Sequence, residues 1–123
     1  MEPMLVLQTA VVILTVSAVG GLAMALIRFT TGANPLAWLA MLHGFLSAAA
    51  VTLLLYASFV IGLPRLANIA LVLFLIAAVG GATLNLGYHW KALPLPKWLV
   101  VAHAAIAASG YLCLLAAVFA APM

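Results

Sequence analysis

The sequence predicts an all-α integral membrane protein, a four-helix bundle made of two tandem helical hairpins. Of its 123 residues, 70% are hydrophobic and only 4% are charged, which is too little charge to cover the surface of a water-soluble domain. Four apolar runs are each long enough to cross a bilayer as a helix, which takes about 20 residues. The second half of the chain also repeats the first, which indicates that one hairpin occurs twice.

We expect one transmembrane domain, residues 1–123, with helix-ending residues between its spans. The four spans are predicted at residues 4–27, 36–61, 66–88 and 98–120. The connections contain Gly32, Pro35, Gly62, Pro64, Pro94 and Pro96. All three connections are short, so neighbouring spans should pack as antiparallel pairs. The first span is too long for a signal peptide and is preceded by Glu2 instead of a basic segment, so we expect it to be retained.

The four cations predict the orientation of the chain in the membrane. Arg28, Lys91 and Lys97 lie in or beside the first and third connections, whereas the second connection has only Arg65. The positive-inside rule places the first and third connections in the cytoplasm and both termini outside. We expect a bacterial inner membrane, with periplasmic termini. Because these cations separate apolar runs, they do not indicate a nucleic-acid partner.

The two halves of the chain are related by an internal repeat. Residues 10–59 align with residues 70–119 without a gap at fifteen identities, where this composition would give about five by chance. The repeats, about 4–61 and 66–120, each contain two spans and should therefore be related by a pseudo-twofold axis along the membrane normal. The second and fourth spans are then parallel, and in an up-down bundle they face each other diagonally.

Two histidines, His43 in WLAMLHGF and His103 in WLVVAHAA, occupy equivalent positions of this repeat. Each lies roughly 10 Å inside the cytoplasmic boundary, at about 1.5 Å of rise per residue. A single intramembrane histidine indicates either a functional site or a polar contact between helices. Two histidines facing each other at one depth suit haem iron, which has two equivalent axial positions. We therefore predict that His43 and His103 are the metal ligands of one haem b.

Five other intramembrane residues belong to the predicted haem site. Gly20, Gly21, Gly80 and Gly81 lie near the depth of the histidines, where glycine lets a porphyrin, or simply a neighbouring helix, approach the backbone. Asn85 shares a helical face with Gly81. We expect its side chain to hydrogen-bond a ligating histidine and fix its tautomer, with a polar contact between helices as the alternative.

Polar residues at the cytoplasmic rim complete the prediction. Arg28 and Lys97 are expected to neutralise the haem propionates. His89 has no counterpart in the first repeat and is interpreted as an interfacial residue. Cys113 is the only cysteine, which rules out a disulfide within the chain, and we expect it to be a small buried hydrophobe.

The segments around the paired histidines carry a resemblance to a known family. LHGFLSAAAVTLLLYA at 42–57 and AHAAIAASGYLCLLAA at 102–117 each place small residues and a leucine-rich tail after the histidine. In this pattern the chain resembles small four-helix transmembrane b-type cytochromes, in which histidines on facing helices hold haem b. The resemblance implies electron transfer, with quinone or a redox protein as the electron partner. Members that carry electrons across the membrane usually have a second histidine pair near the opposite face. That pair is missing from this sequence, which favours one haem serving one side.

Other function classes fit the sequence less well. A cofactor-free accessory or assembly subunit would explain the size of the chain but leaves the paired histidines unexplained. A small transporter that exchanges protons needs an intramembrane carboxylate, and the only acidic residue is Glu2. A chlorophyll-type pigment would need only one histidine. Hydrolysis and group transfer lack a carboxylate pair, a catalytic triad or a phosphate-binding loop, so an enzyme activity would have to be haem-dependent. The sequence leaves open whether the chain forms a homo-oligomer.

Overall fold

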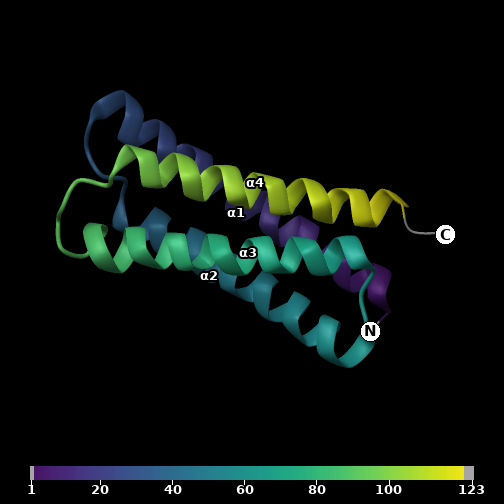
Figure 1. Cartoon of the computed structure of the whole chain (residues 1–123). Helices are drawn as coiled ribbons and strands as arrows, with labels where there is room; N and C mark the ends of the chain where they lie inside the picture. Colours follow the sequence, from purple (N-terminus) through teal and green to yellow (C-terminus); the bar gives the residue numbers. More distant parts are fainter. Residues whose placement is uncertain (1, 121–123) are drawn as a thin grey trace.

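The computed structural model describes residues 2–120, which form four long helices and no strand (Figure 1). The helices are α1 (Pro3–Thr31), α2 (Ala37–Tyr56), α3 (Arg65–Leu84) and α4 (Lys97–Ala120). Two π-helical turns, η1 (Ala57–Ile61) and η2 (Asn85–His89), continue α2 and α3. With these turns, the four continuous helices have 29, 25, 25 and 24 residues. All four are apolar and long enough to span a bilayer, which confirms the predicted four-helix membrane protein.

Glycine and proline end the helices where the sequence predicts. Helix α1 stops at Thr31 because Gly32 adopts φ 73°, the left-handed conformation that commonly closes a helix. Gly62, with φ 88°, follows η1, and Pro64 directly precedes α3. The largest difference from the predicted spans is at the end of α1, which continues for four residues past Ile27, whereas the other bounds differ by at most one residue. The last turn of α1 therefore carries Arg28 within the helix.

The four helices pack in chain order around a common axis. Contacts are most extensive within the hairpins α1–α2 and α3–α4, and α1–α4 and α2–α3 close the bundle. Helices α2 and α4 are therefore diagonal partners, as expected for an up-down bundle. The described ends of the chain lie at one end of the bundle, and the first and third connections lie together at the opposite end (Figure 1).

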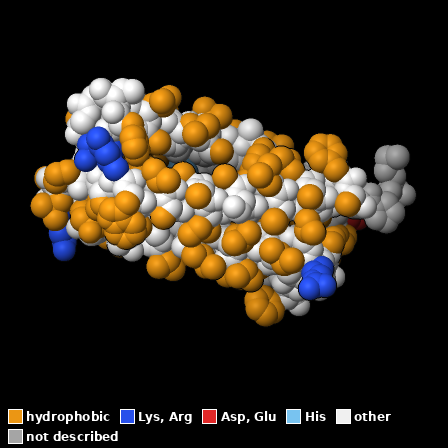
Figure 2. Space-filling view, turned by 45° about the horizontal axis from the view of Figure 1, so that its top comes forward, with side chains coloured by type: hydrophobic (Ala, Val, Ile, Leu, Met, Phe, Trp, Pro, Cys, Tyr) orange, Lys and Arg blue, Asp and Glu red, His pale blue; other side chains and the backbone are white. Residues whose placement is uncertain are grey.

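The outer surface of the bundle is apolar. Large hydrophobic side chains are exposed along all four helices, with Phe59 and Phe119 more than four-fifths exposed. Figure 2 shows hydrophobic side chains over the length of the visible face, with Lys and Arg toward its two ends. A surface of this kind is stable only in contact with lipid, so the chain is an integral membrane protein.

The buried core occupies mainly the half of the bundle near the termini. This terminal-end cluster consists of Leu7, Ala10, Leu14, Ala50, Leu54, Ala67, Ala70, Leu71, Phe74, Leu114 and Ala117. Cys113 packs against it as a partly buried side chain. A second cluster of Leu84, Leu95 and Val100 lies near the connections.

Between these clusters lies a section of the bundle without a buried side chain. It comprises residues 18–31, 37–49, 78–83 and 101–109, none of which is buried. We call it the histidine section because it contains His43 and His103. The two histidines therefore lie where the bundle has no hydrophobic core of its own.

Candidate functional site

The His43 side chain leaves α2 and lies against the backbone of α1. A Cβ atom added to Gly21 would be 3.0 Å from Cε1 of His43, so the ring occupies the space that only glycine leaves open. Nδ1 of His43 lies 2.8 Å from the carbonyl oxygen of Ser17. A carbonyl oxygen only accepts hydrogen bonds, so Nδ1 carries the proton and Nε2 keeps its lone pair.

His103 makes the same contacts in the second hairpin. Its Nδ1 donates to the carbonyl oxygen of Ala77 over 2.8 Å, and a Cβ atom on Gly81 would be 3.1 Å from its Cε1. Each histidine bonds the residue 26 positions earlier in the chain. The sequence repeat thus corresponds to a repeated contact, and both rings have the tautomer with a free Nε2.

The two imidazole rings lie next to each other across the bundle. Their centroids are 6.2 Å apart and their planes are inclined by 79°. Within residues 2–120, the Nε2 atom of neither ring forms a hydrogen bond. No cluster of three or more His, Cys, Asp or Glu occurs in the same residues. The protein therefore offers a metal two imidazole nitrogens and no further side chain of these types.

The paired glycines provide room for the histidines. Gly21 and Gly81 lie under the imidazole rings, and a Cβ atom on Gly80 would also meet His103, 3.5 Å from Nδ1. Gly20 has more space, with Leu39 and Cβ of His43 nearest at 3.8 and 3.9 Å. The predicted residues of the first and second repeats are therefore brought together within each hairpin.

Asn85 is close in sequence to this site but pairs with neither histidine. It is the first residue of η2, one helical turn after Gly81, and the histidine Nδ1 atoms bond backbone carbonyls in its place. Its Oδ1 atom is buried and has no hydrogen-bond partner within the described chain. A buried polar atom of this kind commonly marks a missing water, ion or ligand.

Two serines complete the site and were not among its predicted residues. Ser17 is 2% exposed, and its hydroxyl lies 3.0 Å from Nδ1 of His43 and 2.6 Å from the hydroxyl of Ser47. The sequence gives one indication that Ser17 belongs to the site: it is a polar residue in the middle of a span, one turn before the glycine pair. Its pairing with His43 depends on how α1 and α2 pack.

The two rim cations that were predicted to meet propionates lie where α1 ends and α4 begins. The Arg28 side chain donates from Nε to the Leu95 carbonyl over 3.0 Å and from Nη1 to the Gly32 carbonyl over 2.9 Å. Nζ of Lys97 lies 5.6 Å from the centroid of the Phe29 ring. Arg28 thus joins the first and third connections while it contributes positive charge to this end of the bundle.

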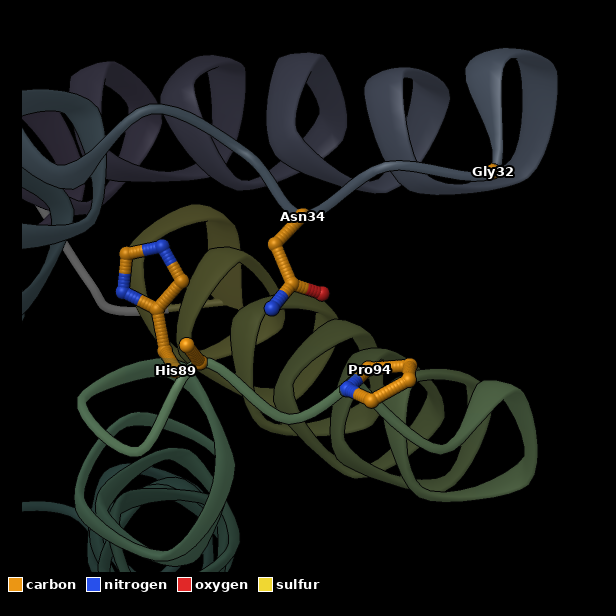
Figure 3. Close-up of a pocket in the computed structure, with 5 residues that line it drawn as sticks. Gly32, Asn34, His89 and Pro94 are labelled. Carbon is orange, nitrogen blue, oxygen red and sulfur yellow. The ribbon is translucent and has the colours of Figure 1, made fainter.

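His89 and Asn34 also join these connections (Figure 3). Nε2 of His89 donates to the Pro35 carbonyl over 2.7 Å. The Asn34 amide donates to the Leu93 carbonyl over 2.7 Å and accepts from the Leu95 N–H over 3.0 Å. A cavity of about 360 Å³ lies beside these bonds, lined by Gly32, Asn34, His89, Ala92 and Pro94. His89 therefore has a structural partner at the rim, away from the paired histidines.

Comparison of the chain with known protein families, with curated proteins and with solved structures finds no match.

Proposed function

We propose that this chain is a membrane electron-transfer protein that binds one haem b, with His43 and His103 as its two axial ligands. The observation that carries the proposal is the pair of imidazoles 6.2 Å apart. In each, Nδ1–H is fixed to a backbone carbonyl and Nε2 is left free. Metal-ligating histidines generally have this arrangement, because the second ring nitrogen sets the tautomer and the ring orientation.

The separation of the rings suits two ligands of one metal. Two imidazoles bound on opposite sides of one metal, through bonds of about 2.0 Å, would have ring centroids roughly 6 Å apart. In the structure the centroids of His43 and His103 are 6.2 Å apart. The donor set also suits haem, since a porphyrin supplies four nitrogens to iron and needs only two more ligands from the protein.

The surroundings of the pair support the same proposal. The histidine section contains no buried side chain, whereas protein interiors are normally close-packed. A large apolar group bound there would bury apolar surface that the helices leave exposed in this section. The partnerless Oδ1 of Asn85 lies one turn from Gly81 on the cytoplasmic side, and the charges of Arg28 and Lys97 lie farther along at the rim. These residues suit the polar edge of a haem.

The protein side chains would hold and tune the group, and bound haem would supply one-electron chemistry. The carbonyl oxygens of Ser17 and Ala77 keep both Nδ1 atoms protonated, which directs Nε2 to the metal. The apolar helices would exclude water from the site. Arg28 and Lys97 at the rim would compensate carboxylate charge.

The position of the pair favours exchange of electrons at one face. Three of the four cations lie at the end of the bundle with the first and third connections, so we infer that this end is cytoplasmic and that both termini are periplasmic in a bacterial inner membrane. Both histidines lie toward this end. Quinone or a redox protein at this face is the proposed electron partner.

An absorption spectrum of the detergent-purified protein, oxidised and then reduced with dithionite, tests the proposal. We expect the spectrum of low-spin haem b at one haem per chain. His43→Ala and His103→Ala should each abolish the low-spin signal, because each removes one axial nitrogen. His89→Ala is the matched control and should retain it. A colourless protein from haem-replete cells would overturn the proposal and favour the accessory-subunit interpretation.

A further inference from the structure

The two hairpins differ in the polar groups that surround their histidines. In the first hairpin, the Ser17 hydroxyl lies 3.0 Å from Nδ1 of His43 and 2.6 Å from the Ser47 hydroxyl. The equivalent residues of the second repeat are Ala77 and Ala107. Among the described residues, His103 therefore has one hydrogen-bond acceptor at Nδ1, the Ala77 carbonyl, whereas His43 has two, the Ser17 carbonyl and hydroxyl.

The Ser17 hydroxyl uses its donor and both of its acceptor positions in hydrogen bonds. Its O–H donates to the His43 carbonyl over 3.2 Å. Its oxygen then accepts from the Ser47 hydroxyl and shares the Nδ1–H of His43 with the Ser17 carbonyl. Ser17 is 2% exposed, and lipid offers no competing partner to any of these groups. The set fixes both the tautomer and the rotation of the His43 ring.

We propose that Ser17 is a positioning residue that makes His43 the stronger of the two axial donors; this inference rests on the proposed haem function. A hydrogen bond from the distal ring nitrogen increases electron donation by the ligating nitrogen to the metal. The second acceptor at Nδ1 adds to this effect at His43 only. The two ligands are therefore equivalent in the backbone but unequal in strength, and Ser47 contributes by orienting the Ser17 hydroxyl.

Substitutions at equivalent positions of the repeat separate this role from general packing. Ser17→Ala removes the second acceptor from His43, and Ala77→Ser offers one to His103. Ser47→Ala removes only the orienting hydroxyl. Ser109→Ala is the matched control, because Ser109 is exposed and, within residues 2–120, its hydroxyl bonds only the Ala105 carbonyl of its own helix.

The midpoint potential and the electron paramagnetic resonance g values of the full-length haem-loaded protein are the readouts. Weaker donation stabilises ferric iron less, so we expect Ser17→Ala to raise the potential and Ser47→Ala to raise it by a smaller amount. Ala77→Ser should lower it, and Ser109→Ala should leave it unchanged. The g values should shift in the first three variants only. Ala77→Ser keeps the test valid if Ser17→Ala does not fold.

Three outcomes would overturn the inference, and they separate it from the proposed function. Wild-type potentials and g values in haem-loaded Ser17→Ala and Ala77→Ser would refute the role of Ser17 and leave the haem assignment intact. Equal shifts in Ser109→Ala would show a nonspecific effect. A wild-type protein without haem would refute the proposed function, and the inference with it.

Discussion

The two hairpins place their histidines in the same way but pack differently around them. The distance from Nδ1 to the carbonyl is 2.8 Å in both, and the Cβ position of the glycine lies 3.0 Å from the histidine Cε1 at Gly21 and 3.1 Å at Gly81. The neighbouring side chains have diverged, with Ser17 opposite Ala77 in the alignment. The position of each imidazole is therefore set by backbone atoms that both repeats share. Its further hydrogen bonding depends on side chains that differ between the repeats.

This difference reflects the physics of helix packing in a membrane. Lipid chains are as apolar as leucine side chains, so hydrophobic burial contributes little to helix association. Close approach at glycine and hydrogen bonds to carbonyls then determine where two helices meet. Contacts of this kind persist when neighbouring side chains change, because they do not depend on them.

The largest effect is expected when the glycines that leave room for the imidazole rings are replaced by a large residue. Gly21→Leu and Gly81→Leu would each place a side chain where an imidazole ring now lies, so each histidine must leave its carbonyl partner. We expect haem occupancy to fall about tenfold or more in both variants, the size of effect seen when a ligating histidine loses its orientation. Haem content per purified chain measures it.

Gly44→Leu is the matched control, because nothing lies within 4 Å of the Cβ position of Gly44. It should retain wild-type haem content. A loss confined to Gly21→Leu or to Gly81→Leu would contradict the equivalence of the two hairpins.

A second variant tests where the hairpins differ in packing. Gly110 is equivalent to the buried Ala50, and Phe74 is equivalent to Leu14. A Cβ atom on Gly110 would be 3.0 Å from Cε1 of Phe74. Because Phe74 is larger than Leu14, it leaves less room at position 110 than Leu14 leaves at Ala50. We expect Gly110→Ala to destabilise the bundle by about 1–3 kcal/mol through overpacking, measured by denaturant unfolding in detergent.

The combination of Gly110→Ala with Phe74→Leu restores the residue types that the first hairpin has at the equivalent positions, Ala50 and Leu14. It should recover most of the lost stability. Equal stability of the double variant and Gly110→Ala alone would show that the clash with Phe74 is not the cause.

The smallest effect is expected at a hydrogen bond between the hairpins. The Tyr111 hydroxyl donates over 2.6 Å to Thr15, whose own hydroxyl donates to the Val11 carbonyl. Neither residue has a polar equivalent, since the repeat places Leu75 and Val51 there. Tyr111→Phe should cost about 0.6 kcal/mol, a typical value for such bonds in membranes. A double-mutant cycle with Thr15→Val measures the coupling, and additive losses would mean that the bond contributes nothing.

Much of the fold follows from the sequence, because lipid allows few alternatives. Backbone groups in lipid must be satisfied within a helix or a closed barrel, so four apolar runs separated by glycine and proline predict four helices. The predicted ends agree with the structure to within one residue except at the end of α1, which continues past Ile27 to Thr31. The repeat also predicts that His43 and His103 share a depth and face each other diagonally.

The partners of these histidines could not be predicted in the same way. Asn85 was expected to fix a histidine tautomer, but carbonyls of the neighbouring helices bond both Nδ1 atoms. Every residue has a backbone carbonyl, so no sequence pattern identifies the carbonyl that accepts the Nδ1–H of a histidine. The rotation of α1 against α2 selects the carbonyl of Ser17 and, in the same contact, brings its hydroxyl to His43.

The sequence alone determined the membrane environment, the number of spans, the repeat and the pair of histidines, because these follow from composition and spacing along one chain. Only the tertiary structure decided that each imidazole rests on a glycine of its own hairpin, that the rings are 6.2 Å apart, and that Ser17 distinguishes one from the other. These features depend on how helices rotate and approach, and that is set by contacts between residues far apart in the chain.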